Sequence, residues 1–102
     1  MLYTDLGNRL GEINVLLRLA AVLRELDRDR AVKILNDAVR LSIDIGNQLA
    51  RIDALDALGD IYMASGDRKT AADVWSSALR TAREHGMPRE EGKLADKVRR
   101  VR

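Results

Sequence analysis

A chain of 102 residues with 46% hydrophobic residues is long enough for one domain with a modest core. The absence of cysteine excludes disulfide bonds and thiolate metal sites, and the scarcity of proline and aromatic residues favours helices over sheets. The net charge is only +2, although basic residues gather near the C-terminal end, and no apolar run approaches the roughly 20 residues of a membrane span. We therefore expect an all-α, cytoplasmic protein without a membrane segment.

The first predicted helix covers residues 8–26. Gly7 and Asn8 at its start are typical of the end of one helix beside the N-cap of the next. We interpret residues 1–7 as the remnant of a preceding helix, because they match the end of the second helix of the next repeat. Helix 8–26 is apolar almost all round, and such a helix expects cover on more than one side. The chain is then a piece of a longer array, or a subunit that associates with another copy, or it tolerates an exposed face. The predicted self-association face is Ile13, Leu16, Leu17 and Ala20.

Four more helices are predicted over residues 28–45, 47–65, 67–85 and 88–101. Gly46 and Gly66 are each followed by Asn or Asp, which places a left-handed C-cap beside a good N-cap. The last helix has one apolar stripe and is otherwise charged, as expected of a capping helix. Its stripe consists of Leu94, Ala95, Val98 and Val101.

An internal repeat with a period of 39–40 residues relates these helices. Gly7, Gly46 and Gly86 begin corresponding segments, and the one-residue difference in period falls in a turn, where helical repeats tolerate it best. The second helices correspond at a constant offset of 40 residues, which matches Ala31, Leu35 and Ala38 with Ala71, Trp75 and Ala78.

The pattern Leu55-x-x-Leu58-Gly59-x-x-Tyr62, followed by Ala71-x-x-x-Trp75-x-x-Ala78, resembles the tetratricopeptide repeat family. The resemblance extends over nearly the whole chain, and the second repeat is the better match. The period exceeds the roughly 34 residues of the family pattern, and is similar to the long repeats of bacterial transcription regulators and of spindle-orientation and kinesin-cargo scaffolds. Small residues at the helix contacts let two helices approach closely while aromatic residues fill the gaps beside them. The structural core is predicted to contain Leu19, Leu35, Ala38, Leu58, Gly59, Tyr62, Ala71, Trp75 and Ala78.

This resemblance implies an antiparallel helix-pair solenoid of five helices, with two full pairs and a C-terminal capping helix. Residues 1–102 then form one domain, in which the remnant of residues 1–7 is followed by the two repeats, 8–46 and 47–86, and by the capping helix, 87–102.

The resemblance also implies a non-catalytic protein–protein interaction module within a larger regulatory or scaffolding protein. In the family, the first helix of each pair lines a concave groove that binds a partner segment. The corresponding residues here are Asn14, Leu17, Ala21, Arg24, Asp53, Asp56, Asp60 and Met63, with Lys93, Asp96 and Arg100 from the last helix. The three aspartates share one helix face and would select a basic or amphipathic protein or peptide. Alternatively they form a solvated face that pairs with Lys93 and Arg100.

No group of residues in the sequence suggests catalysis, a metal or a cofactor. His85 is the only histidine and lies at a helix end, where a structural role suffices. There is no glycine-rich phosphate loop and no nucleophile–base pair. Self-association into a homo-oligomer is the alternative function. Nucleic-acid contact through the basic end, residues 97–102, is a weaker alternative, because no aromatic platform accompanies the charge.

Overall fold

The computed structural model of the chain describes residues 2–101, and side chains for residues 8–101. Within this range there are five α-helices and no strand, which confirms the all-α prediction. Their bounds are α1 (Leu2–Leu26), α2 (Arg28–Ile45), α3 (Gln48–Ala64), α4 (Arg68–Glu84) and α5 (Pro88–Val101). The last four helices begin and end at, or one residue from, the predicted positions. Met1 and Arg102, the ends of the predicted domain, lie outside the described residues, as do the side chains of residues 1–7.

The start of α1 differs from the prediction. The helix begins at Leu2 and passes through Gly7 and Asn8 without a turn, so a helix boundary between residues 7 and 8 is wrong. An established helix gains one hydrogen bond for each residue that it adds, whereas an interior glycine costs only about 1 kcal/mol. Gly7 alone therefore does not end the helix.

Three later glycines do mark helix ends. Gly46, Gly66 and Gly86 have φ angles of 69°, 86° and 62°, a region that favours glycine over other residues. The side chains of Asn47 and Asp67 then accept hydrogen bonds from backbone N–H groups in the first turns of α3 and α4, at 2.9 and 3.1 Å. These paired caps explain why both turns are so short.

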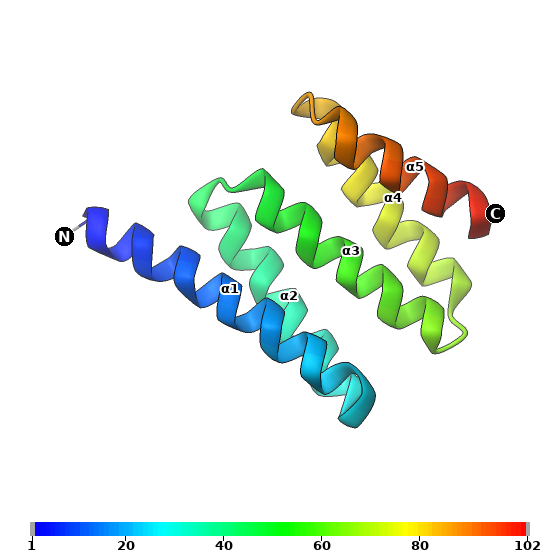
Figure 1. Cartoon of the computed structure of the whole chain (residues 1–102), viewed down its shortest axis with the longest axis horizontal. Helices are drawn as coiled ribbons and strands as arrows, with labels where there is room; N and C mark the ends of the chain where they lie inside the picture. Colours follow the sequence, from blue (N-terminus) through cyan, green and yellow to red (C-terminus); the bar gives the residue numbers. More distant parts are fainter. Residues whose placement is uncertain (1, 102) are drawn as a thin grey trace.

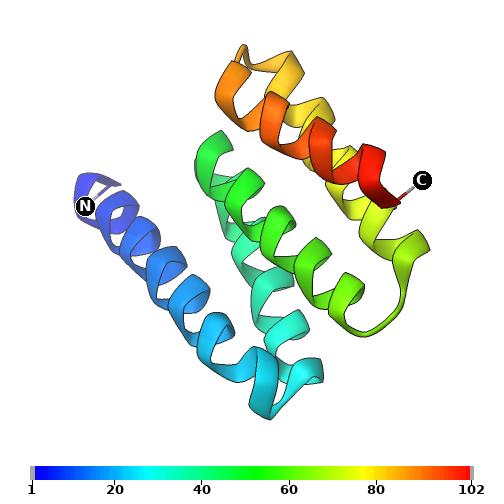
Figure 2. The same cartoon turned by 45° about the vertical axis from the view of Figure 1, so that its right-hand side comes forward.

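The helices form two layers, with α1, α3 and α5 in one and α2 and α4 in the other (Figures 1 and 2). Each helix packs mainly against its neighbours in sequence, and α1 also touches α3. The result is a slab measuring 46 × 35 × 16 Å, with α1 at one edge. The odd-numbered helices together form one broad face of this slab.

The main core lies between the layers and is organised around Trp75. Its indole Nε1 donates a hydrogen bond to the backbone carbonyl of Asp56 at 3.2 Å. A Cβ atom at Gly59 would lie 2.1 Å from this nitrogen, so only glycine allows α3 and α4 to come so close. A second cluster contains Ile13, Ala38, Ala50 and Ala54 and joins α1, α2 and α3.

Most residues that the repeat places in the core are buried, but Leu19 is not. Its side chain is 41% exposed, so its assignment to the core is wrong. The corresponding Leu58 is buried because α3 lies between α2 and α4, whereas α1 has only α2 beside it in the second layer. Tyr62 is half-buried, and the buried members of the predicted set are Leu35, Ala38, Leu58, Gly59, Ala71, Trp75 and Ala78.

Candidate functional site

The residues predicted to line a groove come from the odd-numbered helices, which share one layer (Figure 1). Their exposure divides them into two groups. Asn14, Ala21, Arg24 and Asp53 are exposed, whereas the half-buried residues are Leu17, Asp56, Asp60 and Met63. The contacts between α3 and α5 differ in kind from those between α1 and α3.

Between α3 and α5 the acidic side chains are already paired. Lys97 Nζ lies 2.5 Å from an Asp56 carboxylate oxygen and 3.0 Å from an Asp60 carboxylate oxygen. Lys93 Nζ lies 3.2 Å from the second carboxylate oxygen of Asp56. Asp56 and Asp60 are therefore paired within the chain and do not form an open acidic surface. Arg100, the other expected partner, instead pairs with Asp96 at 3.0 Å.

Lys97 connects α5 to both of the preceding helices. Desolvation lowers its pKa, but the hydrogen bonds and charges of Asp56 and Asp60 outweigh this effect, so the pKa lies above its usual value. The same ammonium lies 5.3 Å from the centroid of the Trp75 ring, within range of a cation–π interaction. In the sequence, Lys97 belongs to the basic end, residues 97–102. Its position four residues after Lys93, on the same side of α5, was the signal for this role.

Between α1 and α3 the face remains open. A cavity of about 60 Å³ lies between the two helices, with a mainly apolar lining to which Arg24 contributes the charged side chain. Its lining residues are Leu17, Ala20, Ala21, Arg24, Leu35, Ala57 and Ile61. We call this region the α1–α3 groove. The structure thus brings the predicted residues Leu17, Ala21 and Arg24 together there, beside Ala57, which was not among the predicted groove residues.

Asp53 lies one turn before Ala57 on α3 and is the exposed member of the aspartate trio. Partial desolvation by its neighbours raises its pKa; Asp56 and Glu90 act in the same direction, and Lys93 opposes them. No ion pair within 4 Å involves Asp53 among residues 8–101. Its carboxylate is thus exposed and without an ion pair, and the charges that act on it are those of Lys93, Asp56 and Glu90.

The predicted self-association face of α1 points into the protein. Ile13 and Ala20 are buried, and Leu16 and Leu17 are half-buried against the core. This prediction is therefore wrong for the face, because these side chains already pack against α2 and α3. The exposed apolar side chains of α1 lie elsewhere on the helix, at Leu10, Val15, Leu19, Val22 and Leu26.

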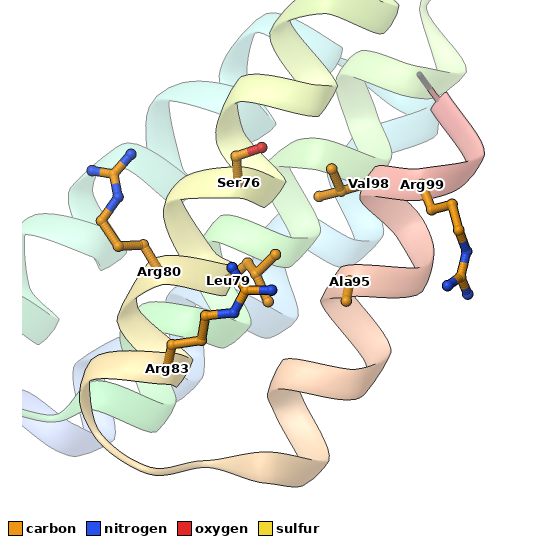
Figure 3. A pocket seen from close by; sticks show the side chains of 7 residues that line it. All are labelled: Ser76, Leu79, Arg80, Arg83, Ala95, Val98 and Arg99. Atoms are coloured by element: carbon orange, nitrogen blue, oxygen red, sulfur yellow. The ribbon is translucent and has the colours of Figure 1, made fainter.

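A second hollow, of about 490 Å³, lies between α4 and α5 (Figure 3). Leu79, Ala95 and Val98 contribute apolar side chains to it, and Arg80, Arg83 and Arg99 contribute cationic ones. Figure 3 shows that Arg80 and Arg99 point to opposite sides, so the arginines do not converge on one point. Arg83 and Arg99 also have acidic partners within the chain, namely Glu91 at 3.4 Å and Asp96 at 2.7 Å.

His85 forms the C-cap of α4 and is exposed. Across the described part of the chain, no three His, Cys, Asp or Glu side chains are placed to hold a metal ion. None of the helices in that part is both long and apolar enough to cross a bilayer.

Comparisons with protein families, with curated proteins and with solved structures find no match to this chain. The likeness to tetratricopeptide repeats therefore rests on the residue pattern and the internal repeat.

Proposed function

We propose that this chain is a non-catalytic protein–protein interaction module of the tetratricopeptide type. In this proposal α1–α2 and α3–α4 are the two helix pairs of a solenoid, and α5 is the capping helix. The sequential packing of the helices, the two layers and the repeat of 39–40 residues support it. Such modules act as rigid scaffolds for partner segments.

The α1–α3 groove is the proposed binding site. The observation that carries this choice is the small, mainly apolar cavity between helices that otherwise touch little. Ligand sites in proteins combine an apolar hollow with a few polar groups that fix orientation, and here Arg24 is the charged residue of the lining. The other half of the face already uses Lys93 and Lys97 to neutralise its carboxylates.

The partner in this proposal is an amphipathic protein segment that places one apolar side chain in the cavity. It carries an acidic group toward Arg24. A strongly basic segment fits less well, because Asp56 and Asp60 each have a cationic partner within the chain.

Selection of peptides from a random library, followed by NMR mapping on the isotope-labelled chain, tests this function. We expect the selected peptides to shift the resonances of Leu17, Ala21 and Ala57. Ala57→Leu fills the cavity and is expected to weaken their binding about tenfold or more, as overpacking by about 1–3 kcal/mol would. Asn36→Leu, on an exposed site of α2, is the matched control and leaves binding unchanged. Equal binding to both variants, or shifts confined to another face, would refute the proposal.

A further inference from the structure

An apolar stripe runs along the side of α1 that faces away from the other helices. It consists of Val15, Leu19, Val22 and Leu26, spaced by four, three and four residues, which places them in one line on a helix. Their exposed fractions are 62%, 41%, 63% and 78%. Figure 1 shows α1 at the edge of the slab, so no described helix lies over this stripe.

The internal repeat shows that these positions are covered elsewhere in the same protein. At an offset of 39 residues, three positions of the stripe correspond to positions of α3 that are buried. These α3 residues are Ala54, Leu58 and Ile61. The difference lies in the neighbours: α3 packs against both α2 and α4, whereas among the described helices α1 packs against α2 and touches α3. The α1 stripe thus has the character of a packing surface that lacks its partner helix.

We propose that α1 pairs with α1 of a second copy of this chain, in antiparallel orientation, to form a homodimer. A two-fold axis passing between Leu19 and Val22 brings Leu19 of one copy against Val22 of the other. The same axis brings Val15 against Leu26. The spacing of four, three and four residues is the one that lets two helices interlock as a short coiled coil. The interface is isologous, so every contact occurs twice.

Charges beside the stripe favour this partner and this orientation. Arg18 and Glu25 lie seven residues apart along the same edge of the stripe, each one residue before a stripe leucine. In the antiparallel register, Arg18 of each copy lies opposite Glu25 of the other, which gives two ion pairs. A parallel pairing instead places Arg18 opposite Leu23 and forms neither ion pair.

Both charges are available for such a contact. Among residues 8–101, Arg18 has no ion-pair partner within 4 Å, and Glu25 has only Arg24, at 3.9 Å. The Glu25 carboxylate is also highly exposed, so its contact with Arg24 is readily exchanged. The stripe lies on another side of α1 from the α1–α3 groove, so dimerisation leaves that groove open. Failure of either proposal leaves the other standing.

Analytical ultracentrifugation of the full chain between about 1 and 500 µM tests the dimer. We expect reversible dimerisation with a Kd in roughly the micromolar range, because the interface is small. Val22→Asp places a charge at its centre and is expected to raise the Kd about 100-fold or more. Leu49→Asp, at an exposed apolar residue of α3 away from the stripe, is the control and leaves the Kd unchanged. Circular dichroism verifies that both variants are folded. A monomer at every concentration, or a Val22→Asp variant that dimerises normally, overturns the proposal.

Charge exchange tests the antiparallel register. Arg18→Glu and Glu25→Arg each place like charges opposite one another, and each is expected to weaken self-association roughly three- to tenfold. Mixing the two variants restores opposite charges in a heterodimer, and combining both changes in one chain restores them in a homodimer. If self-association recovers in both cases, the register is supported. If it fails to recover in one of them, the register is overturned.

Discussion

Replacing Gly59 with Ala gives the sharpest test of how α3 and α4 pack together. The added Cβ would lie 2.1 Å from Nε1, 2.4 Å from Cδ1 and 2.5 Å from Cε2 of Trp75. The indole is buried and held by a hydrogen bond to the carbonyl of Asp56, so it cannot turn aside as a flexible side chain would. Either α3 and α4 must separate or the ring must move and lose that bond.

Opposing effects set the magnitude. Alanine in a helix interior is favoured over glycine by about 1 kcal/mol. Overpacking of a core costs about 1–3 kcal/mol, and leaving the indole N–H without a partner costs about 1–3 kcal/mol more. We therefore expect Gly59→Ala to lower the free energy of unfolding by about 1–5 kcal/mol. A domain of this size has only about 5–15 kcal/mol in total, so the loss is readily measured.

Urea denaturation monitored by circular dichroism measures the change, and two other helical glycines serve as controls. A Cβ at Gly11 in α1 or Gly92 in α5 meets no atom within 4 Å. Alanine at either site is expected to raise stability by about 0.5–1 kcal/mol through helix propensity and reduced chain entropy. Trp75→Leu should also be less harmful when Gly59 is already alanine, because the clash has gone. A Gly59→Ala variant as stable as the parent chain would refute this reasoning.

Two further predictions concern the charged contacts. Lys97→Met removes ion pairs to Asp56 and Asp60 and is expected to lower stability by about 1–2 kcal/mol, between the values for exposed and buried pairs. Because the folded state raises the pKa of Lys97 above its usual 10.5, this contribution is present below that pH and is lost as the pH rises through the raised pKa. The stabilities of parent and variant should therefore converge as the pH rises through the raised pKa, and pH profiles that stay parallel would contradict this. Asp67→Ala removes the N-cap of α4 and is expected to lower the melting temperature more than Asp67→Ser, which can still accept the hydrogen bond from Thr70. Since that hydrogen bond lowers the pKa of Asp67 below its usual 3.8, the stabilisation is present above that pH and disappears as the pH falls through the lowered pKa.

The helices were predictable because their ends carry unambiguous chemistry. Gly46 and Gly66, each followed by a residue that caps the next helix, fixed two turns to within one residue. The inner faces of α2, α4 and α5 followed from their strongly amphipathic patterns. The orientation of α1 did not follow, because apolar residues surround it and the helical period then selects no single face. Ile13 was therefore assigned to an outer surface although it is buried, and Leu19 was assigned to the core although it is exposed.

The predicted groove could be recovered only in part, for a different reason. The register of the repeat identifies which residues of α3 lie on the groove face. It does not show which side chains of α5 reach these residues. Lys97 was interpreted as part of a basic end, yet its long side chain extends to Asp56 and Asp60 and removes them from an open acidic surface. About forty residues separate Lys97 from these partners in the sequence; its spacing from Lys93 indicated its side of α5, and the structure shows that it reaches both carboxylates.

The two edges of the slab are built differently, and this difference supports a specific role for the α1 stripe. At the α5 edge, the register positions that α3 uses to contact α4 carry small or charged residues. At an offset of 40, buried Ile52, Leu55 and Gly59 correspond to Gly92, Ala95 and Arg99, none of which is buried. Arginine in the place of Gly59 prevents the close approach that Trp75 makes, so this edge suits solvent. At the α1 edge, the positions that α3 uses to contact α2 keep Val15, Leu19 and Val22 in place of Ala54, Leu58 and Ile61. A repeat that carries small or charged residues at one edge and retains large apolar residues at the other is expected to cover the second edge with another helix.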